Sequence, residues 1–228
     1  MRRLALFDID CTLIDAHGAG GRAIFAAVEE TYGVRGGLDG YSFHGRTDPG
    51  IVVDLATRWG APADVVAARL PECLERYVAR LRVEVAAGDV EVLPGVCELI
   101  TALACDRRVL VGLLTGNLEP GARVKLAATG LDTLFAIGAY GSDSACRADL
   151  PAVAIARAEE HARYRFSGKE IAVIGDTPYD ITCGAEHGVK AIAVATGKHT
   201  TAELEAHGPD YLFADLSDWR RVYEAILA

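Results

Sequence analysis

The stretch LALFDIDCTLID, residues 4–15, ends an apolar run with two carboxylates, Asp8 and Asp10. Along a strand, residues i and i+2 lie on the same face, so the two acids would repel one another in a shared site that held nothing positive. They lie either in water beyond the end of a strand or beside a cation. The rest of the chain decides between these two interpretations.

The composition predicts a folded, soluble protein without a nucleic-acid partner. The 228 residues suffice for one large domain or for a core with a smaller insertion, and 51% of them are hydrophobic. The net charge of -9, without a basic run, argues against DNA or RNA as a partner. The six cysteines lack metal-finger or disulfide spacing, and no apolar stretch suits a signal peptide or a membrane span. We therefore expect a cytoplasmic protein without a membrane partner.

Helical patterns fill the segment after the first strand. Apolar residues recur at helical spacing in 20–33, 48–60 and 61–85. Asp48 is the expected N-cap of the second helix, with Pro49 in its first turn, and Pro71 is expected to kink or break the third. No strand pattern is found between 15 and 91. The sequence therefore predicts an all-helical domain, 15–91, inserted into a second domain made of 1–14 and 92–228.

Strand patterns alternate with helical patterns in the remainder of the chain. They occur at 108–117, 133–141, 170–177, 190–197 and 210–215. This alternation predicts an α/β fold, a doubly wound, Rossmann-like parallel sheet with helices on both faces. Such sheets bind ligands at the carboxyl ends of their strands. Asp8 and Asp10 therefore lie where a ligand is expected, and the helical insertion is expected to form a lid over that edge.

Polar residues also follow three of the other predicted strands. They are Thr115, Gly116 and Asn117 after one strand, Arg147 after the next, and Asp176 and Asp180 after the third. Carboxylates gathered at one sheet edge raise one another's pKa unless a cation neutralises them. Oxygen ligands without imidazole or thiolate favour Mg²⁺. A Mg²⁺ site beside a hydroxyl, a glycine turn and an arginine is typical of phosphoryl transfer.

Three short motifs resemble those of the haloacid dehalogenase-like superfamily and stand in the family's order. They are DIDCT at 8–12, TGN at 115–117 and GDTPYD at 175–180. The helical insertion after the first motif is similar to the cap of phosphoglycolate phosphatase-like members. The resemblance spans nearly the whole chain. It implies a Rossmann-like core with a helical cap, Mg²⁺ as cofactor, and a phosphatase, expected to be monomeric, that acts on a small phosphorylated metabolite.

The resemblance also implies a role for each motif residue. Asp8 is expected to be the nucleophile that forms an aspartyl-phosphate, and Asp10 the general acid and base. Mg²⁺ is expected on the Asp8 carboxylate, the Asp10 backbone carbonyl and Asp176, with Asp180 acting through water. The transferring phosphoryl group is expected to be bound by Thr115, the Gly116 amide and Asn117.

Two positions depart from the family pattern. Position 11, often glycine in the family, is Cys11. The phosphate-binding lysine of the family has no obvious counterpart, although Arg147 stands at the matching place in the order. Lys125 and Lys169 are alternatives from neighbouring elements. Arginine keeps the charge and can bind phosphate through two donors, so Arg147 is the preferred catalytic residue.

Several of these residues have simpler interpretations. Thr115 could be a helix N-cap, one of Asp176 and Asp180 could cap the following helix, and Arg147 could lie in solvent. In the insertion, Arg46 and His44 are the candidates for binding the non-phosphate end of a substrate, because the loop FHGRTDPG at 43–50 could reach the site.

The acid at the position of Asp10 distinguishes the reactions that different members of the superfamily catalyse. Dehalogenases resemble this chain but lack an acid at the position of Asp10, and phosphonate hydrolases use a cap lysine, whereas 15–91 contains no lysine. A phosphatase is therefore the leading hypothesis. A sugar-phosphate mutase with the same aspartates and a catalytically quiet binding protein on the same fold remain as alternatives.

Overall fold

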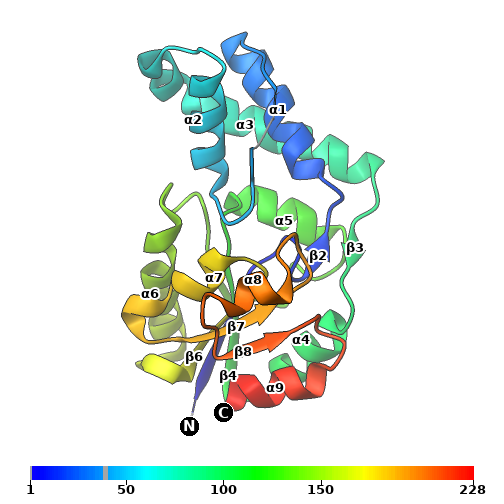
Figure 1. Ribbon diagram of the computed structural model, residues 1–228, viewed down its shortest axis with the longest axis vertical. Coiled ribbons are helices and arrows are strands. Elements are labelled where there is room, and N and C mark those ends of the chain that lie inside the picture. Colours follow the sequence, from blue (N-terminus) through cyan, green and yellow to red (C-terminus); the bar gives the residue numbers. More distant parts are fainter. Residues whose placement is uncertain (1, 38–40) are drawn as a thin grey trace.

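The computed structural model describes residues 2–37 and 41–228, which form a core built on a parallel sheet and a layer of helices above it (Figure 1). The strands are β1 (Arg3–Phe7), β2 (Ile14–Asp15), β3 (Glu91–Val92), β4 (Val109–Leu114), β5 (Ile137–Ala139), β6 (Ile171–Gly175), β7 (Lys190–Val194) and β8 (Tyr211–Phe213). The α-helices are α1 (Ala19–Tyr32), α2 (Asp48–Arg58), α3 (Ala63–Ala87), α4 (Val96–Cys105), α5 (Glu119–Ala127), α6 (Leu150–Ala162), α7 (Pro178–Thr182), α8 (Thr201–Glu205) and α9 (Trp219–Leu227).

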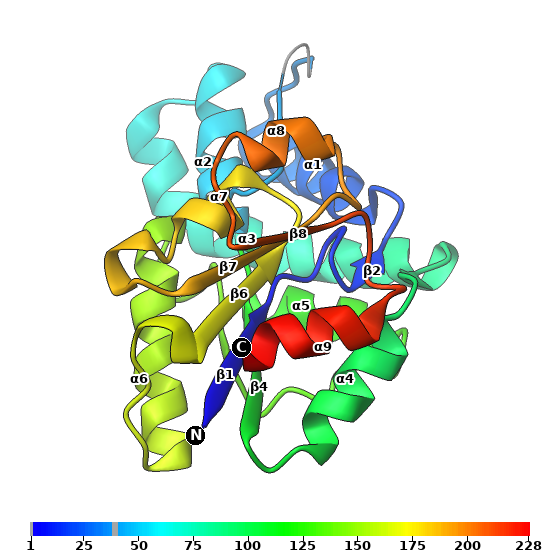
Figure 2. The ribbon, with the colours of Figure 1, turned by 60° about the horizontal axis from the view of Figure 1, so that its bottom comes forward.

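The core sheet has six parallel strands in the order β5-β4-β1-β6-β7-β8. Helices cover both of its faces, with α4 and α9 on one side and α6 on the other (Figure 2). This explains the uninterrupted apolar run of β1, because Ala5 and Phe7 pack on one face while Leu4 and Leu6 pack on the other. The predicted α/β parallel-sheet core is confirmed.

The register of the sheet brings three motifs to one edge. Phe7, the last residue of β1, pairs with Leu113 of β4 and with Ile174 of β6. The residues that follow these strands, including Asp8, Thr115 and Asp176, therefore leave the sheet side by side. They do so at the carboxyl edge, below the layer of helices.

The helices α1, α2 and α3 form the layer above this edge and have a hydrophobic core of their own. We call this layer the cap. Its chain connections to the core run through β2 and β3, a two-residue antiparallel pair. The boundaries predicted for the insertion, 15–91, stay a prediction. Among the residues that the structure describes, no helix is both long and apolar enough to cross a membrane.

In the cap, the N-cap predicted for α2 is wrong, and so is the break that was one of two alternatives at Pro71, whereas a kink there stays a prediction. Pro71 does not break a helix, because α3 continues through it from Ala63 to Ala87. Asp48 is not the N-cap of α2: Thr47 takes that position, and its hydroxyl accepts a hydrogen bond from the Gly50 amide at 3.2 Å. Asp48 is thereby free to direct its carboxylate toward the core.

Candidate active site

A cavity of about 510 Å³ lies between the cap and the carboxyl edge of the sheet. Its volume is within the range of pockets that hold small ligands. Nine of the predicted site residues line it, namely Asp8, Asp10, His44, Arg46, Thr115, Gly116, Asn117, Arg147 and Asp176. The tenth, Asp180, contacts Arg147 from below. The fold thus gathers residues from five separate segments around one cavity.

Asp10 is held by a buried amine that the sequence offered only as an alternative. The Nζ atom of Lys125, on α5, donates to both carboxylate oxygens of Asp10 at 2.8 and 2.7 Å, and to Asn117 Oδ1 at 2.7 Å. The Asn117 side-chain amide in turn donates to Asp10 Oδ2 at 2.8 Å and to the Thr115 hydroxyl at 2.8 Å. Burial alone would raise the pKa of Asp10, but the charge and hydrogen bonds of Lys125 outweigh it and lower that pKa. Asp10 is a carboxylate held in one orientation.

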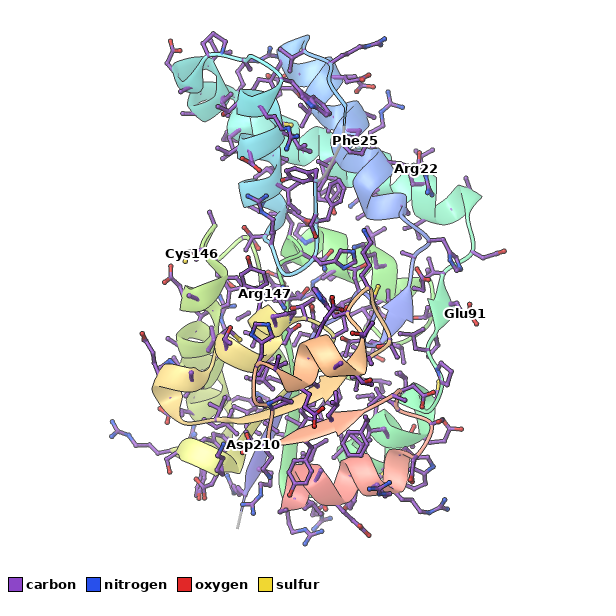
Figure 3. All side chains as sticks on the ribbon, viewed as in Figure 1. Arg22, Phe25, Glu91, Cys146, Arg147 and Asp210 are labelled. Atoms are coloured by element: carbon purple, nitrogen blue, oxygen red, sulfur yellow. The ribbon has the colours of Figure 1, made fainter. Side chains whose placement is uncertain are left out.

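Arg147 is buried beside Asp8, so its interpretation as a surface arginine is wrong. Only 7% of its side chain is exposed, and it lies at the top of the core below the cap (Figure 3). Its Nη2 atom donates to Asp8 Oδ2 at 3.0 Å and to Asp180 Oδ1. Burial raises the pKa of Asp8 to about 6, although the guanidinium opposes that change. The other alternative, Lys169, lies elsewhere and pairs with Asp210 at 2.6 Å.

Three buried carboxylates, those of Asp8, Asp176 and Asp180, have oxygens within 4.8 Å of one another. Burial, together with repulsion from Asp180 and Asp8, raises the pKa of Asp176 to about 8. Among the described residues, Asp176 Oδ2 is buried without a hydrogen-bond partner. A Cβ atom on Gly197 would lie 1.8 Å from this oxygen, so a glycine is needed here. Hard oxygen donors, one of them unpartnered, fit a Mg²⁺ ion.

Of the residues that could have been helix caps, Asp180 is one and Thr115 is not. Asp180 does cap its helix, because its Oδ2 accepts from the Thr177 amide at 3.0 Å and from the Thr177 hydroxyl at 2.6 Å. Thr115 does not cap α5, whose N-cap is Leu118. Its amide pairs instead with the Ala139 carbonyl at 3.0 Å, and its hydroxyl accepts from the amide of Asn117 at 3.3 Å. Thr115 therefore belongs to the site.

The cap loop at 44–48 rests directly on the TGN turn. A Cβ atom on Gly116 would lie 1.9 Å from the Arg46 carbonyl oxygen, so this close approach requires glycine. The Gly116 carbonyl accepts from the Asp48 amide at 2.8 Å, and Asp48 Oδ2 accepts from the Leu118 amide at 2.8 Å. These contacts position the cap over the cavity.

His44 and Arg46 reach the cavity from this loop. The Arg46 guanidinium is already engaged within the cap, where it donates to Asp54 at 2.8 Å and to the Tyr41 hydroxyl at 3.0 Å. His44 is half-buried, and burial together with the nearby charge of Lys198 lowers its pKa. Their predicted role in binding a substrate stays a prediction.

Sequence reasoning missed Asp48 as a site residue and left Lys125 as a secondary choice. Both are buried; Asp48 extends from the cap to Leu118 of the core, and Lys125 contacts Asp10 and Asn117 within the core. The only sequence signal for Lys125 is its rarity, since it is one of four lysines in the chain and stands on an otherwise apolar helix face. Asp48 gave no separate signal, because Asp before Pro is also a common helix start.

Comparison with known proteins agrees with this geometry. A family model described as HAD-hydrolase-like matches residues 151–219. The fold closely matches a hydrolase from Pseudomonas syringae, with 18% identity, 100% of both chains covered and a TM-score of 0.74. A haloacid dehalogenase-like family protein from Streptococcus pneumoniae has the same fold, with 18% identity, 97% of this chain and 98% of that chain covered and a TM-score of 0.66. The chain has the haloacid dehalogenase-like fold. The resemblance seen in the three motifs is thereby confirmed.

Other proteins with the haloacid dehalogenase-like fold differ in their described activity. A predicted phosphoglycolate phosphatase from Haemophilus somnus is 18% identical over 97% of both chains, with a TM-score of 0.73. A candidate beta-phosphoglucomutase from Bacteroides vulgatus is 18% identical over 99% of this chain and 89% of its own, also with a TM-score of 0.73. No curated protein sequence matches the chain. These neighbours show the fold, and the reaction has to be inferred from the residues of the site.

Proposed function

We propose that this chain is a Mg²⁺-dependent phosphatase that hydrolyses a small phosphorylated metabolite through an aspartyl-phosphate. The observation that carries the proposal is the pair Asp8 and Asp10, in which one carboxylate is bound to Arg147 and the other to Lys125. The two carboxylates therefore have different environments, and the roles of Asp8 as nucleophile and Asp10 as general acid and base follow the order of the motif. The haloacid dehalogenase-like fold supports the same assignment.

The reaction has two steps. In the first, Asp10 takes up a proton from solvent as the substrate binds, a carboxylate oxygen of Asp8 attacks phosphorus, the ester P–O bond breaks, and the proton passes from Asp10 to the leaving oxygen. In the second, a water attacks the same phosphorus, its proton passes to Asp10, and the Asp8–phosphorus bond breaks to release inorganic phosphate. Arg147 neutralises negative charge next to Asp8, and the Thr115 hydroxyl and the Gly116 amide bind phosphoryl oxygens.

The residues suited to Mg²⁺ are Asp8, the Asp10 carbonyl and Asp176, with Asp180 next to them. When bound, the ion supplies positive charge against the phosphoryl oxygens and relieves the repulsion among these carboxylates. Asp180 already bonds to Thr177 and Arg147, so its part is to orient Arg147 as well as to add negative charge.

The cap side of the cavity favours a substrate whose organic part is mostly apolar. Ile24, Phe25, Phe43 and Ile51 line this side, and the rings of Phe25 and Phe43 meet edge to face at 5.6 Å. Phe25 and Arg22 both lie on α1 (Figure 3). Arg22, like Arg46, is paired within the cap, here with Glu84 at 2.6 Å. Arg22 and Arg46 are therefore both already paired, and neither is free to bind a second anionic group on the substrate.

Phosphate release from p-nitrophenyl phosphate and a panel of small esters tests the proposal. The panel spans alkyl, aromatic and sugar phosphates and is run with Mg²⁺, with EDTA and with Asp8→Asn. We expect Mg²⁺-dependent release that Asp8→Asn lowers by at least about a thousandfold, since no nucleophile remains. Wild-type-like turnover in Asp8→Asn would contradict the mechanism.

The candidate mutase among the structural neighbours defines the second function. A mutase uses the same two aspartates but returns the phosphoryl group to a bound sugar. It would be activated by a sugar bisphosphate and would release little free phosphate. A folded protein that shows neither behaviour on the panel would instead support a binding role.

A further inference from the structure

Cys11, directly after Asp10, has no part in the proposed reaction. Its φ angle of 57° lies in the left-handed region, which glycine adopts without strain and a cysteine does not. Its carbonyl oxygen accepts a hydrogen bond from the Thr196 hydroxyl. A residue with a strained backbone that lines the cavity is a candidate for a function of its own.

Two further metal-binding groups lie beside the Cys11 thiol. Cys11 Sγ, a ring nitrogen of His44 and a carboxylate oxygen of Asp176 all lie within 4.8 Å of one another. They come from three segments, the turn after β1, the cap loop and the turn after β6. Asp176 is 1% exposed, and its Oδ2 atom is buried without a hydrogen-bond partner among the described residues. Asp176 therefore has a carboxylate oxygen that no hydrogen bond from the described residues occupies.

We propose that Cys11, His44 and Asp176 form a second metal site, selective for a thiophilic divalent cation such as Zn²⁺, and that Zn²⁺ bound there inhibits turnover. Thiolate, imidazole and carboxylate together are a zinc donor set, and three protein ligands leave a fourth position for water. Mg²⁺ prefers oxygen ligands, so the sulfur and nitrogen donors select against it.

The protonation of the ligands is compatible with this site. Zn²⁺ binds a neutral imidazole, such as that of His44, through the lone pair of a ring nitrogen. The Cys11 thiol gives up its proton to solvent when sulfur binds the cation. Burial first, and then the charges of Asp176 and Asp10, disfavour a free thiolate, so the sulfur loses its proton only as the cation binds.

The position of the site explains the inhibition, which rests on the proposed function. Asp176 belongs to both sets of metal-binding groups, so Zn²⁺ on one of its oxygens competes with Mg²⁺ for this ligand. His44 comes from the cap, whereas Cys11 and Asp176 come from the core. A single bound ion therefore ties the two layers together and opposes the movement that substrate exchange requires.

Metal binding is tested on the untagged full chain without any substrate. Zn²⁺ is titrated by calorimetry, and Co²⁺ is used as a spectroscopic probe of thiolate ligation. We expect one Zn²⁺ per chain and a thiolate-to-cobalt charge-transfer band. Cys11→Ser and His44→Asn are each expected to weaken Zn²⁺ binding at least about tenfold, which corresponds to about 1.4 kcal/mol. Cys11→Ser is also expected to remove the band.

Cys183→Ser is the matched control, because Cys183 is also a half-buried free thiol but lies outside the trio. It is expected to keep the affinity and the band. Equal Zn²⁺ affinity in all four proteins, or no charge-transfer band in the wild type, would overturn the site.

The inhibition has a separate test. Turnover of the best ester is measured at fixed Mg²⁺ with increasing Zn²⁺, each protein being compared with its own zinc-free rate. We expect Cys11→Ser to need at least about ten times more Zn²⁺ for half-inhibition than wild type, matching the loss of affinity. Equal sensitivity would overturn the inhibitory role. If the wild type binds Zn²⁺ but hydrolyses no ester, the metal site is supported and the proposed phosphatase activity is contradicted.

Discussion

At the scale of single residues, Lys125 is the side chain on which the orientation of Asp10 depends. It is buried and donates three hydrogen bonds at 2.7–2.8 Å, two of them to Asp10. Burial disfavours the ammonium ion, but the charges of Asp10 and Asp48 outweigh this and raise the pKa of Lys125. Since Lys125 touches Asp10 and not the reacting atoms, we regard it as a positioning residue. Its loss removes both Lys125 hydrogen bonds and leaves Asp10 with the one from the Asn117 amide, which holds the carboxylate less firmly.

Lys125→Met is expected to lower kcat/KM at least about tenfold for an alkyl phosphate, because proton transfer by a well-placed acid contributes on the order of a hundredfold or more. The loss for p-nitrophenyl phosphate is expected to be smaller, since its leaving group needs little protonation. Steady-state kinetics on both esters measure this difference. Lys125→Arg, which keeps the charge, is the conservative control and is expected to recover part of the loss. An equal loss on both esters would indicate a structural role only.

Asp48 is the second residue whose burial has a measurable consequence. Burial raises its pKa to about 6, although Lys125 and the Leu118 amide both favour the charged form. The folded chain thus binds the proton more tightly than the unfolded chain does. The stability associated with protonated Asp48 is complete below the unfolded pKa near 3.8 and is lost as the pH rises through about 6.

Asp48→Asn is therefore expected to be stabilising above pH 7 and nearly neutral at pH 4. A shift of about two units corresponds to roughly 3 kcal/mol, which is an upper bound because the lost attraction of Lys125 offsets part of it. The asparagine oxygen can still accept from the Leu118 amide. Denaturant unfolding of both proteins at the two pH values measures the difference. A variant that is less stable than wild type at pH 8 would contradict this assignment.

At the scale of elements, α3 keeps a proline inside a continuous helix. Pro71 is exposed and lies eight residues after the first residue of the helix, Ala63, so it removes an interior backbone hydrogen bond. The helix persists because buried residues such as Cys73, Tyr77 and Leu81 pack in the cap core. Packing therefore outweighs the local preference of this proline.

Pro71→Ala is expected to stabilise the protein by about 1–2 kcal/mol. Proline disfavours a helix interior by about 3 kcal/mol relative to alanine, and the greater freedom of the unfolded variant removes part of that gain. Thermal and denaturant unfolding measure the change, with Pro62→Ala as the matched control at the N-cap of the same helix. A destabilised Pro71→Ala variant would mean that the proline shapes the packing of the cap.

At the scale of the whole molecule, the site exists because two layers close over one sheet edge. The core supplies the three buried carboxylates, and the cap closes over them through its hydrogen bonds to Gly116 and Leu118. Carboxylates with pKa values raised to about 6 at Asp8 and about 8 at Asp176 destabilise the fold when they ionise. A divalent cation offsets this repulsion, so metal binding and folding are linked.

Mg²⁺ is accordingly expected to raise the Tm of the wild type. At a concentration of about 100 times the Kd, a single site adds about 2.7 kcal/mol, or roughly 5–10 °C for a chain of this size. Asp176→Asn is expected to lose most of this rise, whereas Asp89→Asn, which removes an exposed loop carboxylate, is expected to keep it. Thermal unfolding with Mg²⁺ and with EDTA measures the effect. The same rise in all three proteins would place the ion elsewhere.

The sequence was sufficient for the sheet and for the motif residues. An apolar run that ends in Asp8 predicts a buried strand with its polar end at the ligand edge, and the same reasoning applies to Thr115 and Asp176. These are local patterns, because a strand end and the residue after it are adjacent in the chain. The prediction failed where two local interpretations competed, as at Asp48, and where packing overrode propensity, as at Pro71.

By itself, then, the sequence determined the α/β core and the acids at its edge, through the periodicity of strands and helices. Only the tertiary structure decided which cationic side chains pair with those acids. Lys125 reaches Asp10 across 115 residues, Arg147 reaches Asp8 across 139, and His44 is carried to Cys11 by the cap. The physical reason is that hydrogen bonding and ion pairing act over a few ångströms, and the packing of one layer on the other sets those distances.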